Sequence, residues 1–418
     1  MMKWKLETIL LSAVLACVGF KVDCNALTQA TSSGEPKLPI VGNLSNYHGA
    51  DLGSRLASCV AALPATGGVC DARGEGANLT LSSDLIIDKP YTTIYLPQGV
   101  IQMGSHSIVV RAATYGTSIV ATAMHGRFTV PGQTRLRYSG KGCAIQVGDS
   151  ITDTVGFRAD DLFIDLTEAT SAANGLCLTR TQDVTIVRPT IFGIQSSENK
   201  QVLIKLDGTG NYTSGLIQQP FLNNGNVHIM FTGQAGTAQG ANAVTVLAAR
   251  STGNGGASIA VKIENGDGNT FLGGDFENMG TAFYLGGRAV INSFYGVRLE
   301  KNTKDFVMNS GSLHNLVHVS EVRNYVDNGT QNTILLGRYT GTADLAFRAG
   351  ETSGCADSTL PVDGASPGDA VALGSPVPPQ NGFYSAFVSA PNTVTVRYCS
   401  LLPRSSVDGA FHVEVSKH

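Results

Sequence analysis

A pattern of alternating apolar and polar positions recurs three times between residues 269 and 324. The copies begin at Asn269, Asn292 and Asn315, which are 23 residues apart. Each copy has the alternation of a strand and contains no segment of helical length. A fixed period in the 20s with this content is typical of a solenoid. Each copy therefore predicts one coil of a parallel β-helix.

The stacking of these coils predicts which side chains are neighbours. Paired strands lie about 4.8 Å apart, so each residue is expected to stack on the residue 23 positions later. Side chains of a strand alternate between its two faces, which sends apolar columns inward and charged columns outward. The three asparagines are expected to form a hydrogen-bonded ladder. The apolar columns are Phe271, Phe294 and Val317, and Phe276, Leu299 and Val322; the outward columns are Asp275, Arg298 and Glu321, and Glu277, Glu300 and Arg323.

A single amphipathic helix is predicted ahead of the first strands. Leu52, Leu56 and Val60 recur at helical spacing, Asp51 can cap the start, and Pro64 follows the end. An open first coil would expose unpaired strand edges that recruit other chains. We expect this helix to cover that coil.

The residues after the helix resemble a known family. Gly-Gly-Val-Cys-Asp-Ala-Arg-Gly at 67–74 and Tyr-Leu-Pro-Gln-Gly at 95–99 look like the start of pectate-lyase-like right-handed β-helices. That group includes polygalacturonases, polysaccharide lyases and phage tailspikes, and the resemblance covers about residues 47–340. It implies an all-β, right-handed parallel β-helix and polysaccharide as the ligand class. One such scaffold hosts many functions, and the Asn-Thr-Asp, Gly-His-Gly and Arg-Ile-Lys signatures of polygalacturonases are absent.

The two ends of the chain differ from the middle. Lys3 and Lys5, an apolar run over 9–20 and Ala26 indicate a signal peptide over 1–26. A flexible leader is expected over 27–46 and the β-helix over 47–350. Proline-interrupted, alternating strands after Cys355 predict a small antiparallel, β-sandwich-like module over 351–418. The protein is thus expected to be secreted, either extracellular or periplasmic.

The composition of the chain limits the classes of partner that it is expected to bind. The net charge is −3, or −4 without residues 1–26, and 15% of residues are charged. No basic face for nucleic acid is expected, and the apolar run at the start is too short to span a membrane. Polysaccharide is the predicted partner. A homo-oligomer, such as a trimer, is compatible with the same sequence.

Six cysteines remain after the signal peptide, and an even number in an exported chain favours disulfides. Fifteen connectivities are possible. The cysteines fall into three neighbourhoods, which favours Cys59–Cys70, Cys143–Cys177 and Cys355–Cys399. The alternative is that some of them are buried free thiols.

The strongest candidate for chemistry is the stacked pair Glu277 and Glu300. Two carboxylates one strand spacing apart should raise the pKa of one of them, and the separation suits the carboxylate pair of a retaining glycosidase. Arg298 can neutralise an acidic sugar or act as the base of a lyase. These three residues are the predicted catalytic set. The predicted substrate-binding set is Asp275, Tyr295, His318, Glu321 and Arg323.

A simpler interpretation treats the same charges as structural. Asp275, Arg298 and Glu321 alternate in sign, and Glu300 opposes Arg323, as cross-strand pairing prefers. On this interpretation the protein is a non-catalytic surface-binding, adhesive or structural β-helix protein. No cofactor is predicted, although Asp165 and Glu168 are candidate calcium ligands by analogy with lyases.

Overall fold

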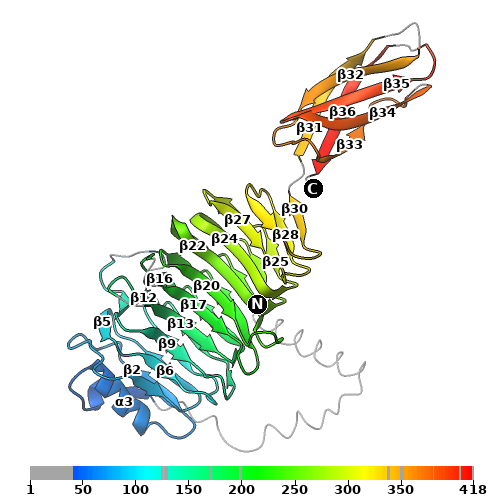
Figure 1. Ribbon diagram of the computed structural model, residues 1–418. Coiled ribbons are helices and arrows are strands. Elements are labelled where there is room, and N and C mark those ends of the chain that lie inside the picture. Colours follow the sequence, from blue (N-terminus) through cyan, green and yellow to red (C-terminus); the bar gives the residue numbers. More distant parts are fainter. Residues whose placement is uncertain are drawn as a thin grey trace, which may run out of the picture. The chain divides into compact units, whose positions relative to one another are not determined.

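The protein is described by a computed structural model, shown in Figure 1. It describes residues 41–416 except 124–125, 127–129, 170–171, 197–199, 337–338, 349–352, 380 and 404–405. The predicted signal peptide and the leader up to residue 40 lie outside the described residues. Among the residues described, no helix is long and apolar enough to cross a membrane.

The main body is a parallel β-solenoid. One twelve-stranded sheet, which we call sheet A, runs along its whole length with every pair parallel. Its successive strands come from successive coils, as the repeat predicts. Sheet A consists of β1 (Val41–Asn43), β2 (Gly68–Asp71), β4 (Thr92–Tyr95), β7 (Ser118–Val120), β11 (Arg158–Asp160), β15 (Val184–Val187), β18 (Thr213–Gln218), β21 (Ala241–Leu247), β23 (Thr270–Leu272), β25 (Ser293–Tyr295), β28 (Leu316–Val319) and β30 (Thr333–Leu336).

A sixteen-stranded sheet makes up the other two faces, because two long strands continue from one to the other. These are β22 (Arg250–Asp267) and β24 (Asp275–Val290). Face B contains their first residues with β5 (Gly99–Gly104), β8 (Thr134–Tyr138), β12 (Phe163–Asp165), β16 (Thr190–Phe192), β19 (Phe221–Asn223) and β26 (Arg298–Glu300). Face C contains their later residues with β3 (Leu85–Ile87), β6 (Ile108–Val110), β9 (Gly142–Val147), β13 (Ala173–Thr179), β17 (Val202–Asp207), β20 (Val227–Thr232), β27 (Lys304–Met308) and β29 (Tyr325–Asp327). A short pair, β10 (Thr154–Val155) and β14 (Thr181–Gln182), stands apart.

The predicted inward columns fill the solenoid. Phe271 pairs in register with Phe294, and their rings stack with centroids 5.0 Å apart. Phe294 is in register with Val317, and Phe276 with Leu299. The third member of the second column departs from the prediction: Val322 is buried, but it follows β28 without forming a strand against β26.

The asparagine ladder is confirmed and is longer than predicted. The Nδ2 of Asn269 donates to the Oδ1 of Asn292 at 2.9 Å, and Asn292 donates in the same way to Asn315 at 2.9 Å. Asn315 then donates to Asn332 at 2.9 Å. The 23-residue repeat does not predict Asn332, because this residue lies only 17 positions after Asn315.

The N-terminal end is closed by α3 (Leu52–Ala62), as predicted. Asp51 caps it through a reciprocal pair of bonds with Ser54, and its buried face contributes Leu52, Leu56 and Val60 to the core. The predicted leader ends too late. Residues 41–46 form β1, which pairs with β2, and the short helix η2 (Leu44–Asn46), whose Leu44 is fully buried.

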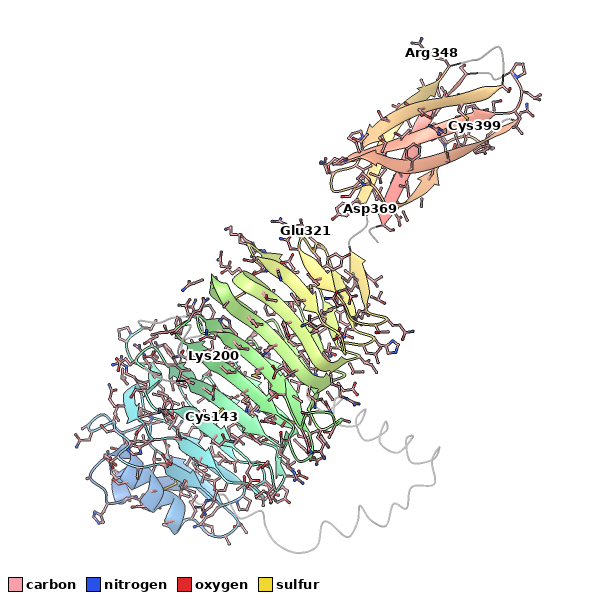
Figure 2. All side chains as sticks on the ribbon, in the orientation of Figure 1. Cys143, Lys200, Glu321, Arg348, Asp369 and Cys399 are labelled. Carbon is pink, nitrogen blue, oxygen red and sulfur yellow. A yellow bond between two sulfur atoms is a disulfide. The ribbon has the colours of Figure 1, made fainter. Side chains whose placement is uncertain are left out.

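All three predicted disulfides are present. Cys59–Cys70 ties α3 to β2, Cys143–Cys177 joins neighbouring strands β9 and β13, and Cys355–Cys399 links two strands of the C-terminal module. Cys143 and Cys399 are labelled in Figure 2. The alternative of buried free thiols is thereby wrong for these six residues.

In the six coils that contain β11, β15, β18, β21, β23 and β25, the chain turns the corner from sheet A to face B through a left-handed backbone position. Ala248 has φ 50° and Gly296 has φ 60° at equivalent positions, and each amide N–H donates to the next coil. A side chain in this conformation costs about 1–2 kcal/mol. A Cβ at Gly296 would meet nothing within 4 Å, so only this backbone cost should apply there.

We expect Gly296→Ala to lower the free energy of unfolding by about 1 kcal/mol. Ala248→Gly is the matched control and should raise it by up to about 1 kcal/mol, because it relieves the same conformation. Urea denaturation followed by circular dichroism measures both. Changes of the same sign in the two variants would contradict the corner geometry.

The C-terminal module is antiparallel, as predicted, with its own core around Phe347, Tyr398 and Phe411. Its pairing starts before the predicted boundary at 351, because β31 already pairs with β36. One sheet contains β31 (Tyr339–Phe347), β36 (Val407–Ser416) and β33 (Ala370–Gly374); the other contains β32 (Gly354–Pro361), β35 (Thr393–Ser400) and β34 (Gly382–Ala390).

Candidate functional site

The predicted charged columns lie on the outward side of face B. Asp275 is in register with Arg298, and Glu277 with Glu300, as the 23-residue rule requires. Each pair spans β24 and β26, whose inward residues Phe276 and Leu299 anchor the strands in the core. The stacked strands therefore fix the positions of the Cα atoms from which these charged side chains project.

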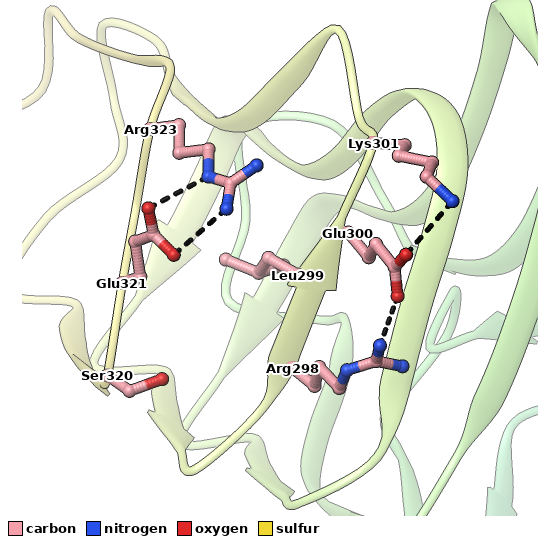
Figure 3. A pocket seen from close by; sticks show the side chains of 7 residues that line it. All are labelled: Arg298, Leu299, Glu300, Lys301, Ser320, Glu321 and Arg323. Carbon is pink, nitrogen blue, oxygen red and sulfur yellow. Dashed lines mark hydrogen bonds and ion pairs between the residues drawn. The ribbon is translucent and has the colours of Figure 1, made fainter.

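A pocket of about 430 Å³ opens beside these columns (Figure 3). It is formed by β26 and by the segment that follows β28. Its lining consists of Arg298, Leu299, Glu300, Lys301, Ser320, Glu321 and Arg323. Three of these residues are cationic and two are anionic, so the pocket offers hydrogen-bond donors and acceptors side by side.

The charged groups of the pocket are held by ion pairs. Arg298 donates to Asp275 at 2.9 Å and also contacts Glu300. Lys301 lies 3.1 Å from Glu300. Arg323 donates to both oxygens of Glu321, at 2.8 and 3.2 Å. The two arginine side chains are still 61% and 63% exposed, so they remain accessible to a ligand.

The electrostatics of Glu300 favour its charged form. Its pKa is lowered, first by the hydrogen bond from Lys301 and then by the charge of Arg298. The stacking of Glu277 on Glu300 predicts a raised pKa for one of the two carboxyls. At Glu300 the pKa is lowered and not raised, because the neighbouring cations favour the carboxylate form. Glu277 accepts a hydrogen bond from the hydroxyl of Thr252 at 2.9 Å.

The predicted alternation across coils is only partly realised. Asp275–Arg298 is formed, but Arg298 and Arg323 each bond the glutamate two positions away on their own segment. Residues two apart in an extended segment share a face, so the long arginine side chains reach them. The expected pairing of Glu300 with Arg323 gives way to Arg323–Glu321. Arg323 accordingly has a raised pKa, caused first by the hydrogen bond to Glu321.

Tyr295 and His318 belong to a different face. They stack one coil apart as predicted, with ring centroids 6.2 Å apart. They lie on the outward side of β25 and β28 in sheet A, across the corner at Gly296 from Arg298. Neither residue lines the pocket. The predicted site is therefore divided between two faces of the solenoid.

The candidate calcium ligand Asp165 is not available to a cation. It is fully buried, and Arg135 donates to its Oδ2 at 2.9 Å while Arg137 approaches at 3.3 Å. Two guanidinium groups already neutralise this carboxylate. Within the described part of the chain, no group of three or more His, Cys, Asp or Glu side chains is placed to hold a metal ion.

Arg250 and Thr252 extend the outward columns by one coil and were missed from the sequence. Arg250 is in register with Asp275, and Thr252 with Glu277. Both lie 25 residues before their partners, so a strict step of 23 passes over them. The aligned apolar pair Val246 and Phe271, also 25 apart, is the signal that would have revealed them.

Comparisons with known proteins give structural likeness only. No family model and no curated protein matches this chain. The tailspike protein gp49 from Pseudomonas phage LKA1 is similar in structure, at 9% identity and TM-score 0.36, over 80% of this chain and 67% of that one. The tailspike protein of E. coli bacteriophage HK620 in complex with pentasaccharide has 10% identity and TM-score 0.30, over 90% and 93%. Geobacillus virus E2 ORF18 has 11% identity and TM-score 0.36, over 88% and 77%. These values are too low to transfer a ligand or a reaction.

Proposed function

We propose that this protein is exported and binds an acidic polysaccharide at the face B pocket. The observation that carries the proposal is the set of exposed guanidinium groups of Arg298 and Arg323, each held in place by carboxylates on a rigid stack. Guanidinium groups bind carboxylates through paired hydrogen bonds. Glu300 and Glu321 supply acceptors for sugar hydroxyls.

Export is supported by the three disulfides, which form and persist in oxidising compartments. The predicted signal peptide agrees with this.

Binding is favoured over hydrolysis or elimination by the state of the predicted catalytic set. A glycosidase needs one carboxyl whose pKa is raised, so that it can donate a proton. The pKa of Glu300 moves the other way. Arg298 is bonded by two carboxylates, and acting as a base would require it to give up the proton that supports these pairs. The residues Glu277, Glu300 and Arg298 are therefore proposed as ligand contacts or as support for them.

The proposal predicts that Arg298→Gln with Arg323→Gln weakens binding to polygalacturonate or alginate at least tenfold. Affinity electrophoresis through gels that contain each polysaccharide measures this. The control is Arg397→Gln, which removes a comparable exposed guanidinium that bonds Asp357 at 2.7 and 2.8 Å in the C-terminal module. Exposed ion pairs contribute little to stability, so all variants should melt close to the parent.

Unchanged retardation of the double variant would refute the face B pocket as the binding site. Release of reducing ends or of unsaturated sugars by the parent protein would refute the non-catalytic interpretation. If that product also disappeared in Glu277→Gln and Glu300→Gln, the catalytic role first predicted for these residues would be restored.

A further inference from the structure

The outward side of sheet A carries no charged side chain over seven consecutive coils, from β15 to β30. The register of the strands groups its outward residues into two columns. Asp, Glu, Lys and Arg are absent from both. One column contains Thr185, Leu216, Thr245, Thr270, Ser293, Leu316 and Thr333; the other contains Val187, Gln218, Leu247, Leu272, Tyr295, His318 and Leu335. We call this surface the neutral face.

The two columns differ in chemistry. The first is rich in hydroxyl groups, and the second presents apolar and ring surfaces. Leu272 and Tyr295 are each 37% exposed and Leu335 is 46% exposed. The ring of Tyr295 meets His318 of the next coil edge to face. A band of polar groups therefore runs beside a band of apolar groups along the solenoid axis.

The neutral face has clear limits. Its first coil borders β11, where Arg158 and Asp160 form an ion pair in the same two columns. Around the corner, face B carries Asp275 and Arg298 on the same coils. On face C, Lys262 pairs with Glu264. The lack of charge is a property of this one surface and not of the coils as a whole.

We infer that the neutral face is a second binding surface, which takes an uncharged polysaccharide chain lying along the solenoid axis. The inference rests on the proposed function, because it assigns a further site for the same class of ligand. A pyranose ring has apolar C–H faces and a rim of hydroxyls, which match the apolar and hydroxyl columns respectively. The coil spacing of about 4.8 Å is close to the length of one sugar residue, so equivalent contacts recur along the chain.

The size of the neutral face argues against a second copy of this chain as its occupant. Seven strands at about 4.8 Å, with two outward residues about 6.6 Å apart on each strand, give a surface of about 450 Å². A stable protein interface takes about 800 Å² from each partner. A single glycan chain needs only a narrow, regular strip, and it contributes no charge that the face would leave unpaired.

The test is the double variant Leu272→Thr with Tyr295→Thr in the full chain. Threonine is well accepted in strands, so the fold should persist, as a thermal melt by circular dichroism will show. The probes are hydroxyethylcellulose and galactomannan, both uncharged, with polygalacturonate as the acidic comparison. Ile151→Thr is the control, because Ile151 is 78% exposed and lies outside the neutral face.

We expect the double variant to bind the uncharged polysaccharides at least tenfold more weakly and to bind polygalacturonate as the parent does. Arg298→Gln with Arg323→Gln should give the reverse. Unchanged retention of the uncharged probes by Leu272→Thr with Tyr295→Thr overturns the inference and leaves the face B proposal intact.

A parent that binds no polysaccharide of either kind removes both proposals. A parent oligomer that dissociates in the double variant, measured by sedimentation velocity, also overturns the inference, because the face would then be a subunit interface.

Discussion

Replacing Asn292 with alanine is expected to lower the free energy of unfolding by about 4 kcal/mol, because several buried groups lose their partners at about 1–3 kcal/mol each. Asn292 is fully buried. Its Oδ1 accepts from the backbone N–H of Asn269 at 3.1 Å and from the Nδ2 of Asn269 at 2.9 Å. Its Nδ2 donates to Asn315 at 2.9 Å and to the carbonyl of Gly266 at 3.2 Å. Urea denaturation measured by circular dichroism gives the change.

The control for this variant is Asn328→Ala, at an exposed asparagine. A surface substitution of this kind changes stability by less than about 0.5 kcal/mol. A loss for Asn292→Ala as small as that of the control would mean that the ladder contributes no net stability. In Asn292→Ala the backbone amides of the neighbouring coils should also exchange their hydrogens faster than in the parent, because each coil is ordered by the coils beside it.

The second large effect is a loss of stability in acid that depends on His228. This histidine is fully buried, with its Nδ1 2.7 Å from the hydroxyl of Ser251. Burial lowers its pKa from 6.5 to about 3. The folded protein therefore keeps the imidazole neutral, while the unfolded chain takes up a proton below pH 6.5. Stability from this residue is complete above pH 6.5 and is lost as the pH falls toward 3, by about 1.4 kcal/mol for each pH unit.

His228→Leu removes this titration and should flatten the fall in stability between pH 6.5 and 4. Leu203 occupies the neighbouring coil beside this position and is buried, so leucine is compatible with the surroundings. The variant leaves the hydroxyl of Ser251 without this partner and should be less stable at pH 7, but that cost does not vary with pH. His48→Gln, at an exposed histidine, should keep the slope of the parent. Parallel pH profiles for the parent and His228→Leu would show that His228 does not cause the acid sensitivity.

The columns of the solenoid could be predicted wherever one coil repeats the length of the next. The step of 23 holds from Asn269 to Asn292 and to Asn315, so it correctly places the ladder and the Phe271–Phe294 stack. It fails where the coil length changes. The step from Asn315 to Asn332 is six residues shorter than 23, and the step from Arg250 to Asp275 is two residues longer. A constant step of 23 therefore predicts neither Asn332 nor Arg250.

The side-chain pairing of the site was harder to predict than its position. Register places Arg298 beside Asp275, but a long guanidinium can also reach along its own strand, and it contacts Glu300 there. Lys301 adds a cation next to Glu300 from a position outside the two outward columns. The separation of Tyr295 from Arg298 onto two faces depends on the two-residue corner at Gly296. A repeat period alone does not reveal where such a corner falls.

The corners of the coils also determine how this molecule can vary. Between β7 and β8, the N–H of Gly126 donates to the hydroxyl oxygen of Thr190 on face B. The strands on either side, β7 and β8, pair in register with β11 and β12, although 13 residues separate them where other corners have only two. Because register is set by the strands and loops tolerate insertions, new segments can be added at a corner without rebuilding the coils. Recognition elements of such a protein are thus free to diversify while its scaffold stays the same.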